Sequence, residues 1–130
     1  MFISFAWTTD PFLADAKDMT RRYWTIRHAM FFRKGMIVDA YDRLPHRKGK
    51  KIGEIKILKK PYPQPTGQMT EEDFKREGLE WMQKNNQKIK GQDARAFFEE
   101  WKQKNDTVWV LEFEKLPWDK SLSKQQTSLF

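Results

Sequence analysis

Aromatic residues are the feature of this chain that most limits what it can fold into. The 130 residues include ten Phe and six Trp, whereas aliphatic residues are sparse. Charged residues make up 33% of the chain, and the mean hydropathy is −0.88. Chains of such polarity that stay unfolded usually lack aromatic rings. We therefore expect one folded domain with an aromatic core, covering residues 1–116, followed by a polar and flexible tail at residues 117–130.

Charge and residue types narrow the function classes. The net charge of +7 favours partners that carry phosphate groups or anionic membranes, and the alternative is that the charge serves solubility alone. The chain has no Cys, which excludes disulfides, thiolate nucleophiles and Cys-ligated zinc. His28 and His46 are isolated, so we predict neither a metal site nor a cofactor. No apolar run approaches the roughly 20 residues that span a bilayer, and no signal peptide is visible. We expect a soluble cytoplasmic protein without a membrane partner.

The order of the predicted elements favours an α+β fold. The pattern predicts an irregular crossing at the three prolines of residues 60–67, and helices at residues 11–16, 70–78 and 94–101. In the third helix, Ala94, Phe97, Phe98 and Trp101 recur at the spacing of one buried face, which favours a role in the core over a platform for base stacking. Strands are predicted at residues 2–6, 20–26, 36–42, 52–58 and 107–114. About five strands with helices packed outside them suit a small barrel or a curled sheet. Periodicity alone does not distinguish a barrel from a sandwich.

The predicted strand at residues 20–26 carries the first candidate site. Thr20, Arg22 and Trp24 alternate and so share one face. Arg suits a phosphate or carbonyl group, and Trp suits stacking on a base. The alternative is a row facing solvent, with Trp24 half buried. Lys17 lies just before this strand and could act as a general base if its pKa falls from about 10.4. The alternative for Lys17 is an ordinary surface lysine.

Two further groups of polar residues are candidates. Glu77 shares a helix face with Phe74, so it points toward the core or borders a cavity, where it could transfer protons. The alternative is a carboxylate at the rim, paired with Lys or Arg. The turn around Gly49 holds five basic residues and no acidic one, which suits contact with a nucleic-acid backbone or plain solvation. These candidate nucleic-acid-binding residues are Arg43, Arg47, Lys48, Lys50 and Lys51.

Five segments, in the same order, resemble bacterial ASCH-domain proteins from about residue 3 to Glu114. They are ISFAWTT (residues 3–9), KDMTRRYW (17–24), VDAYD (38–42), KKIG (50–53) and EEDFKREG (71–78). The resemblance implies a PUA-like β-barrel of about five strands with flanking helices and a cleft. The sequence departs from the family pattern in two places. Asp15-Ala-Lys17 replaces the usual Gly-Arg-Lys or Gly-Lys-Lys, and Lys48-Gly49 replaces Gly-Gly.

The resemblance also implies functions. The family is associated with RNA binding, and some small members are amidohydrolases that remove the acetyl group of N4-acetylcytidine. By motif position, their catalytic residues fall on Lys17, Thr20 and Glu77. The substrate-binding residues that we predict are Arg21, Arg22, Trp24 and Asp42. The partner is then a modified nucleoside or RNA.

Three functions compete at this point. In the amidohydrolase, Lys17 is the base, Thr20 is the nucleophile or orients a water, and Glu77 passes a proton to the leaving amine. Arg22 then holds the developing oxyanion. The alternative is a non-catalytic RNA-binding module, in which the basic turn contacts phosphates. A ribonuclease, which other family members are reported to be, ranks last: the two His residues are isolated and no metal cluster is predicted, so its acid–base groups would have to be Lys17 and Glu77.

Overall fold

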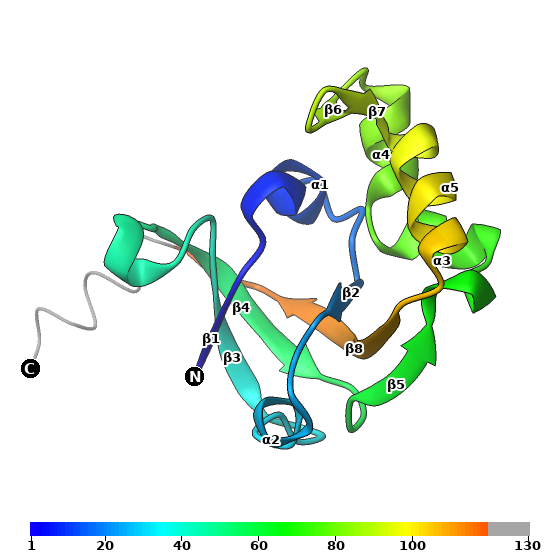
Figure 1. The fold of residues 1–130 in the computed structure, drawn as a ribbon. Coiled ribbons are helices and arrows are strands. Elements are labelled where there is room, and N and C mark those ends of the chain that lie inside the picture. The colour runs from blue at the N-terminus through cyan, green and yellow to red at the C-terminus, as the bar shows by residue number, and fades with distance from the viewer. Residues whose placement is uncertain (120–130) are drawn as a thin grey trace, which may run out of the picture.

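A mixed sheet of six strands forms the centre of the computed structural model, which describes residues 1–119 (Figure 1). The strand order is β1-β3-β4-β8-β2, and β5 pairs with β8 as well. The β1–β3 pair is parallel, and the other pairs are antiparallel. The strands are β1 (Phe2–Ser4), β2 (Met19–Arg22), β3 (Ile37–Tyr41), β4 (Lys51–Ile57), β5 (Tyr62–Pro65) and β8 (Thr107–Leu116). The α+β prediction is confirmed.

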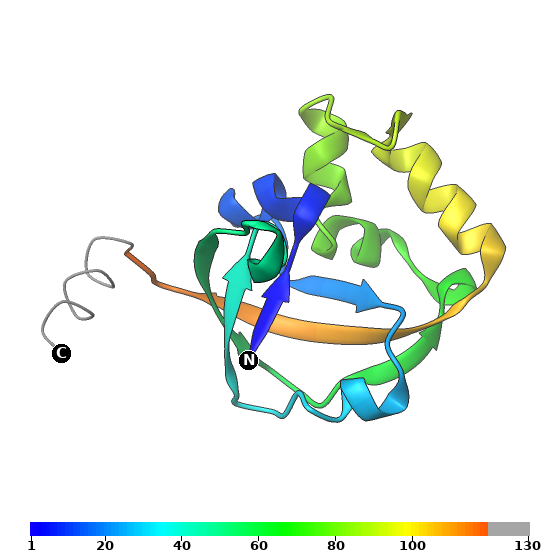
Figure 2. The ribbon, with the colours of Figure 1, turned by 60° about the vertical axis from the view of Figure 1, so that its left-hand side comes forward.

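The long strand β8 organises the sheet. Its first half pairs with β2 on one side and β5 on the other, and its second half pairs with β4. This sharing of one strand bends the sheet around β8 (Figure 2). The side chain of Arg22, on β2, donates a hydrogen bond to the Ser4 carbonyl oxygen of β1 over 2.7 Å. The strands at the two ends of the sheet path are therefore joined through a side chain.

Two predictions about strands were wrong. The strand expected at residues 20–26 ends at Arg22, because the Thr25 hydroxyl accepts a hydrogen bond from the His28 amide and begins helix α2 (Ile26–Ala29). Part of the expected irregular crossing at residues 60–67 is strand β5. Its prolines are tolerated because β5 pairs with β8 alone and leaves its other edge free of partners in the described sheet.

The helices gather mainly on one side of the curved sheet (Figure 2). A small hairpin, β6 (Lys88–Ile89) and β7 (Gln92–Asp93), connects two of them. The α-helices besides α2 are α1 (Thr9–Leu13), α3 (Glu71–Arg76), α4 (Leu79–Lys84) and α5 (Ala94–Lys104). Single 3-10 turns lie at η1 (Ala6–Thr8), η2 (Pro45–Arg47) and η3 (Thr66–Gln68). No helix among residues 1–119 is long and apolar enough to cross a membrane.

The start of α3 and the turn after it follow the sequence signals. Thr70 and Asp73 form a capping box, in which each side chain accepts a hydrogen bond from the other's backbone amide. Gly78 then adopts a φ of +92° between α3 and α4. A Cβ atom there would lie 2.7 Å from Pro11 Cβ and 3.3 Å from Lys17 Cβ. Only glycine lets the end of α3 approach the Lys17 segment this closely.

Two separate apolar clusters form the core. The first lies within the sheet and includes Phe5, Phe12 and Phe113; the second lies among α3, α4 and α5 and includes Phe74 and Phe98. The prediction of an aromatic core was only partly right. Phe rings lie in both clusters, but Ile, Val, Leu and Met side chains make up most of the buried apolar residues, and no Trp among residues 1–119 is buried. The predicted domain reaches Leu116, the last residue of β8. Of the predicted tail, residues 120–130 lie outside the described residues.

Candidate functional site

A cleft of about 390 Å³ lies between the curved sheet and α5. Residues of the β1–η1 segment, β2 and the end of α3 line one part of it, and residues of α5 and the β6–β7 hairpin line the other. Both apolar clusters border the cleft, since Phe5 belongs to the first and Phe97 packs against the second. Its volume is within the range that encloses a small ligand.

Lys17 and Glu77 meet at the floor of this cleft, although 60 positions separate them in the sequence. Only 3% of Lys17 and 4% of Glu77 is exposed. Lys17 Nζ donates to Glu77 Oε2 over 3.1 Å, to the Glu77 carbonyl oxygen over 2.9 Å and to the Met19 carbonyl oxygen over 2.8 Å. Three acceptors satisfy all three protons of an ammonium group. Lys17 is therefore held rigidly at a fixed position in the cleft.

Burial lowers the pKa of Lys17 below its usual value. Removal of water from the amine is the largest cause, and the attraction of Glu77 opposes it. The nearby guanidinium groups of Arg22 and Arg21 lower the pKa further. The direction of this shift is the one that a general-base lysine requires.

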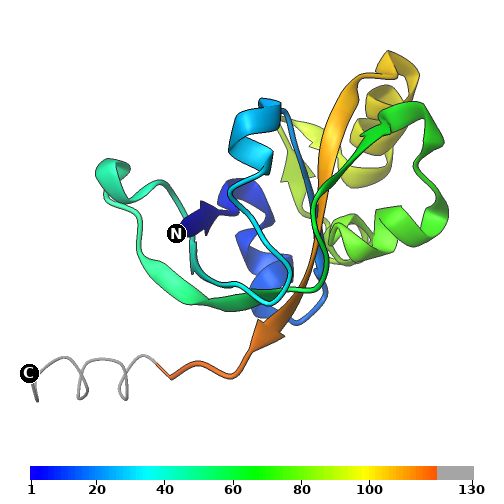
Figure 3. The same ribbon diagram turned by 90° about the horizontal axis from the view of Figure 1, so that it is seen from below.

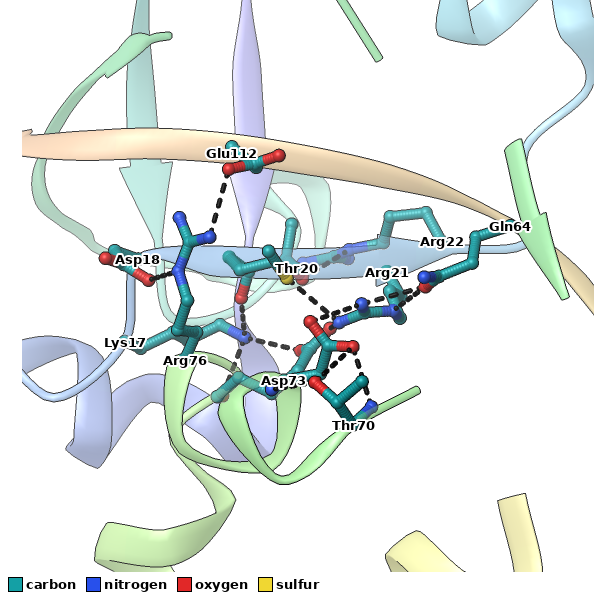
Figure 4. A network of polar contacts seen from close by, with 12 residues as sticks. Lys17, Asp18, Thr20, Arg21, Arg22, Gln64, Thr70, Asp73, Arg76 and Glu112 are labelled. Atoms are coloured by element: carbon teal, nitrogen blue, oxygen red, sulfur yellow. Dashed lines mark hydrogen bonds and ion pairs between the residues drawn. The ribbon is translucent and has the colours of Figure 1, made fainter. Parts of the chain in front are cut away.

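Arg21, drawn beside Gln64 and Asp73 in Figure 4, also fixes the carboxylate of Glu77, through the oxygen atom that does not contact Lys17 Nζ. Its NH1 donates to Glu77 Oε1 over 2.9 Å, and its NH2 lies 3.0 Å from Asp73 Oδ1. The same guanidinium donates to Gln64 Oε1 of β5. Its side chain has no exposed surface. Arg21 therefore borders the cleft, but its charged group positions Glu77 instead of projecting into open space.

Thr20 and Arg22 form the neighbouring part of the cleft. Arg22 Nε donates to Thr20 Oγ1 over 3.2 Å, and Thr20 is only 4% exposed. Burial lowers the pKa of Arg22 to about 10. Three cationic side chains thus adjoin the two carboxylates of Asp73 and Glu77. This excess of positive charge suits an oxygen atom that gains negative charge.

Other predicted site residues lie elsewhere. Trp24 is beyond the end of β2 and stacks on Phe32, with ring centroids 4.6 Å apart and planes at 2°. The Asp42 carboxylate accepts a hydrogen bond from the Lys50 amide within the β3–β4 connection. Neither residue lines the cleft.

The basic turn is also remote from the cleft. It includes η2, which lies at the far end of the molecule from α5 (Figures 1 and 3). Four of its five basic residues are exposed, and Lys51 pairs with Asp39 and Glu54. The residues concerned are Arg43, Arg47, Lys48, Lys50 and Lys51, and none of them lines the cleft.

Sequence reasoning missed the aromatic side of the cleft. Trp7, Tyr23, Phe97 and Trp101 line it. The helical spacing of Phe97, Phe98 and Trp101 indicated one buried face, but only Phe98 is fully buried and the other two are half buried. The signal available was the width of the stripe, since adjacent Phe97 and Phe98 point in different directions on a helix: Phe98 lies within the second cluster, and Phe97 packs at its edge, where it also lines the cleft. Among residues 1–119, no group of three His, Asp or Glu side chains is placed to hold a metal ion.

Fold and cleft together define a small α+β domain with a mixed six-stranded sheet and a buried polar site at the helix-covered side. The chain resembles the crystal structure of protein EF3133 from Enterococcus faecalis V583, described with the family model DUF984. The TM-score is 0.53 at 15% sequence identity, and the match covers 85% of this chain and 71% of that chain. This likeness concerns the fold. No family model and no curated protein matches the sequence.

Proposed function

We propose that this protein is an ASCH-type domain with a PUA-like barrel, and that it hydrolyses the N4-acyl group of cytidine-like nucleosides. The observation that carries the proposal is the buried Lys17–Glu77 contact beside Thr20, at the floor of a cleft the size of a small ligand. The sequence resemblance supplies the reaction, and the curled sheet, joined at its ends by Arg22, supports the barrel.

Amide hydrolysis requires a base, a nucleophile and a proton donor. Lys17, once neutral, accepts a proton from the Thr20 hydroxyl or from a water that this hydroxyl orients. The oxygen atom attacks the acyl carbon, and the bond between that carbon and N4 breaks. Glu77 passes a proton from Lys17 to N4, which leaves as the amine of cytidine. When Thr20 carries the acyl group, a water releases it as a carboxylic acid.

Arg22 supplies electrostatic stabilisation in this scheme. Its guanidinium already donates to Thr20 Oγ1, so it lies within reach of an acyl group attached or adjacent to that oxygen. Its second contact, to the Ser4 carbonyl oxygen, holds it in place before substrate arrives. A donor that is fixed in advance stabilises an oxyanion more than one that must reorganise.

The test is incubation of the protein with N4-acetylcytidine and chromatographic detection of cytidine. We expect cytidine from wild type and from Lys56→Ala, which alters an exposed lysine of β4. We expect a loss of at least about 100-fold in Lys17→Ala. Equal rates for wild type and Lys17→Ala, or no cytidine from any of them, would refute the proposed reaction.

A second function rests on a different surface. Four exposed basic residues lie around η2, namely Arg43, Arg47, Lys48 and Lys50. None of the four takes part in the ion pairs found within residues 1–119, whereas Lys51 does. Such a surface can bind an RNA backbone independently of the cleft, with an affinity that falls steeply as salt increases.

A further inference from the structure

Three aromatic rings form a continuous wall in the cleft, and nothing in the proposed reaction uses them. Trp7 comes from η1, and Phe97 and Trp101 come from α5. The rings of Trp7 and Phe97 meet edge to face with centroids 5.3 Å apart, and those of Phe97 and Trp101 are 5.8 Å apart. All three residues line the same cleft as Lys17 and Thr20. We call Trp7, Phe97 and Trp101 the aromatic wall.

The Trp101 end of the aromatic wall is fixed in place. Trp101 Nε1 donates to the Tyr23 hydroxyl over 2.7 Å. The Tyr23 hydroxyl in turn donates to Asp106 Oδ2 over 2.9 Å. The Trp101 carbonyl oxygen accepts a hydrogen bond from the Thr66 hydroxyl over 2.7 Å. The wall is therefore anchored to the end of β2, to the start of β8 and to η3, so binding a ligand requires little reordering of Trp101.

The outer end of the aromatic wall is open. Trp7 is 43% exposed, although its ring is large and apolar. A flat ligand that covers this indole removes apolar surface from water and gains a stacking contact. The same cleft also has polar lining residues, among them Lys17, Thr20 and Arg22. Apolar and polar lining residues together match a nucleobase, whose faces stack and whose edges form hydrogen bonds.

We propose that the aromatic wall is the binding subsite for a planar heterocycle, which it orients with the exocyclic substituent toward Lys17 and Thr20. The ribose then lies toward the cleft rim, where Gln92 and Glu100 hydrogen-bond to each other and can instead contact its hydroxyl groups. This inference deepens the proposed function in that the substituent is its acyl group. Ring binding itself does not depend on hydrolysis.

A role in packing alone has different consequences. If the aromatic wall only covered the second apolar cluster, shortening Trp7 would lower the stability of the protein without changing the affinity of the cleft. The exposure of Trp7 argues against a large contribution to packing. Stability and affinity must therefore be measured on the same variants.

The test is a calorimetric titration of wild type, Trp7→Ala, Trp7→Phe and Phe31→Ala with N4-acetylcytidine and with the free base N4-acetylcytosine. Phe31→Ala is the matched control, because Phe31 is 56% exposed and lies outside the cleft. We expect Trp7→Ala to weaken the binding of both ligands about 10- to 100-fold, which is the usual loss when a stacking ring is removed. Trp7→Phe should retain most of the affinity, and Phe31→Ala all of it.

The outcomes separate this inference from the proposed reaction. Binding that depends on Trp7 without release of cytidine supports the ring subsite and refutes the reaction. Hydrolysis with an unchanged KM in Trp7→Ala supports the reaction and overturns the ring subsite. The ring subsite is overturned if the wild-type protein binds neither ligand. It is also overturned if Trp7→Ala binds both ligands as tightly as wild type and only unfolds at a lower temperature.

Discussion

At the residue scale, the proposed reaction depends on how burial changes the pKa of Lys17. Water no longer stabilises its ammonium form, and two guanidinium groups repel that form. Glu77 acts in the opposite direction and keeps the pair electrically balanced. The three hydrogen-bond partners of Lys17 are all acceptors, so they favour its ammonium form and oppose the effect of burial. When the amine loses one proton, two N–H donors remain to hold it in place.

The lowered pKa of Lys17 predicts the pH dependence of hydrolysis. In the proposed reaction the neutral amine is the base, so kcat/KM should rise as pH rises through the pKa of Lys17 and then level off. Because that pKa lies below 10.5, the rise should be centred below 10.5. Initial rates with N4-acetylcytidine across this range measure it. A rate that falls with increasing pH in this range would contradict the assignment of Lys17 as base.

At the element scale, the junction of α3 and α4 places Glu77. The capping box starts α3, Gly78 ends it, and the Asp18 amide donates to the Arg76 carbonyl oxygen over 3.0 Å. The last turn of α3 is thus attached to the Lys17 segment by backbone as well as by side chains. Glu77 reaches Lys17 because the helix ends at this position.

Substitution of Gly78 tests the junction. Gly78→Ala introduces a Cβ only 2.7 Å from Pro11 Cβ and strains a φ of +92°. We expect the free energy of unfolding to fall by about 1–3 kcal/mol. We also expect hydrolysis to decline, because Glu77 shifts away from Lys17. Urea unfolding monitored by tryptophan fluorescence measures the stability. Gly91→Ala is the control, because Gly91 also has a positive φ but an added Cβ there would have no atom within 4 Å. Equal activity in the two variants would argue against this role of the junction.

Local signals explain which elements could be predicted from the sequence. The capping box and Gly78 act within a few residues, so α3 and its end were predictable. Strand β5 was not, since its prolines are tolerated only at an edge that tertiary structure creates. Trp24 was misplaced because the Thr25 cap starts a helix within an otherwise strand-like run. The aromatic wall depends on the packing of η1 against α5, which no local pattern encodes.

At the scale of the whole molecule, two charged regions are separated. The cleft lies between the two apolar clusters, whereas the exposed basic residues around η2 lie at the other end (Figure 3). Lys17, Thr20, Arg21, Arg22 and Glu77 could be picked out from the sequence, and the structure brings them together. Their grouping required β2 to pair with β8 beside the end of α3, which is a long-range feature.

This separation predicts independent effects of substitution. Reversing the charge of Arg47 and Lys48 to Glu should weaken binding to single-stranded RNA and reduce its salt dependence. The kcat/KM for N4-acetylcytidine should change by no more than about twofold, because neither residue approaches the cleft and surface charges are screened over about 10 Å. Filter binding at several salt concentrations and the hydrolysis assay provide the comparison. If the substitutions leave RNA binding unchanged, the basic turn does not contact RNA.

The central claim is that Lys17 and Glu77 act as one unit. Its most direct test is a double-mutant cycle on kcat/KM for N4-acetylcytidine, with Lys17→Met, Glu77→Gln and the double variant, each checked for folding by near-UV circular dichroism. We predict that each single substitution lowers kcat/KM at least about 100-fold. The kcat/KM of the double variant should be no more than about tenfold below that of the slower single variant. A double variant whose loss equals the product of the two single losses, or a folded single variant with wild-type activity, would contradict the account.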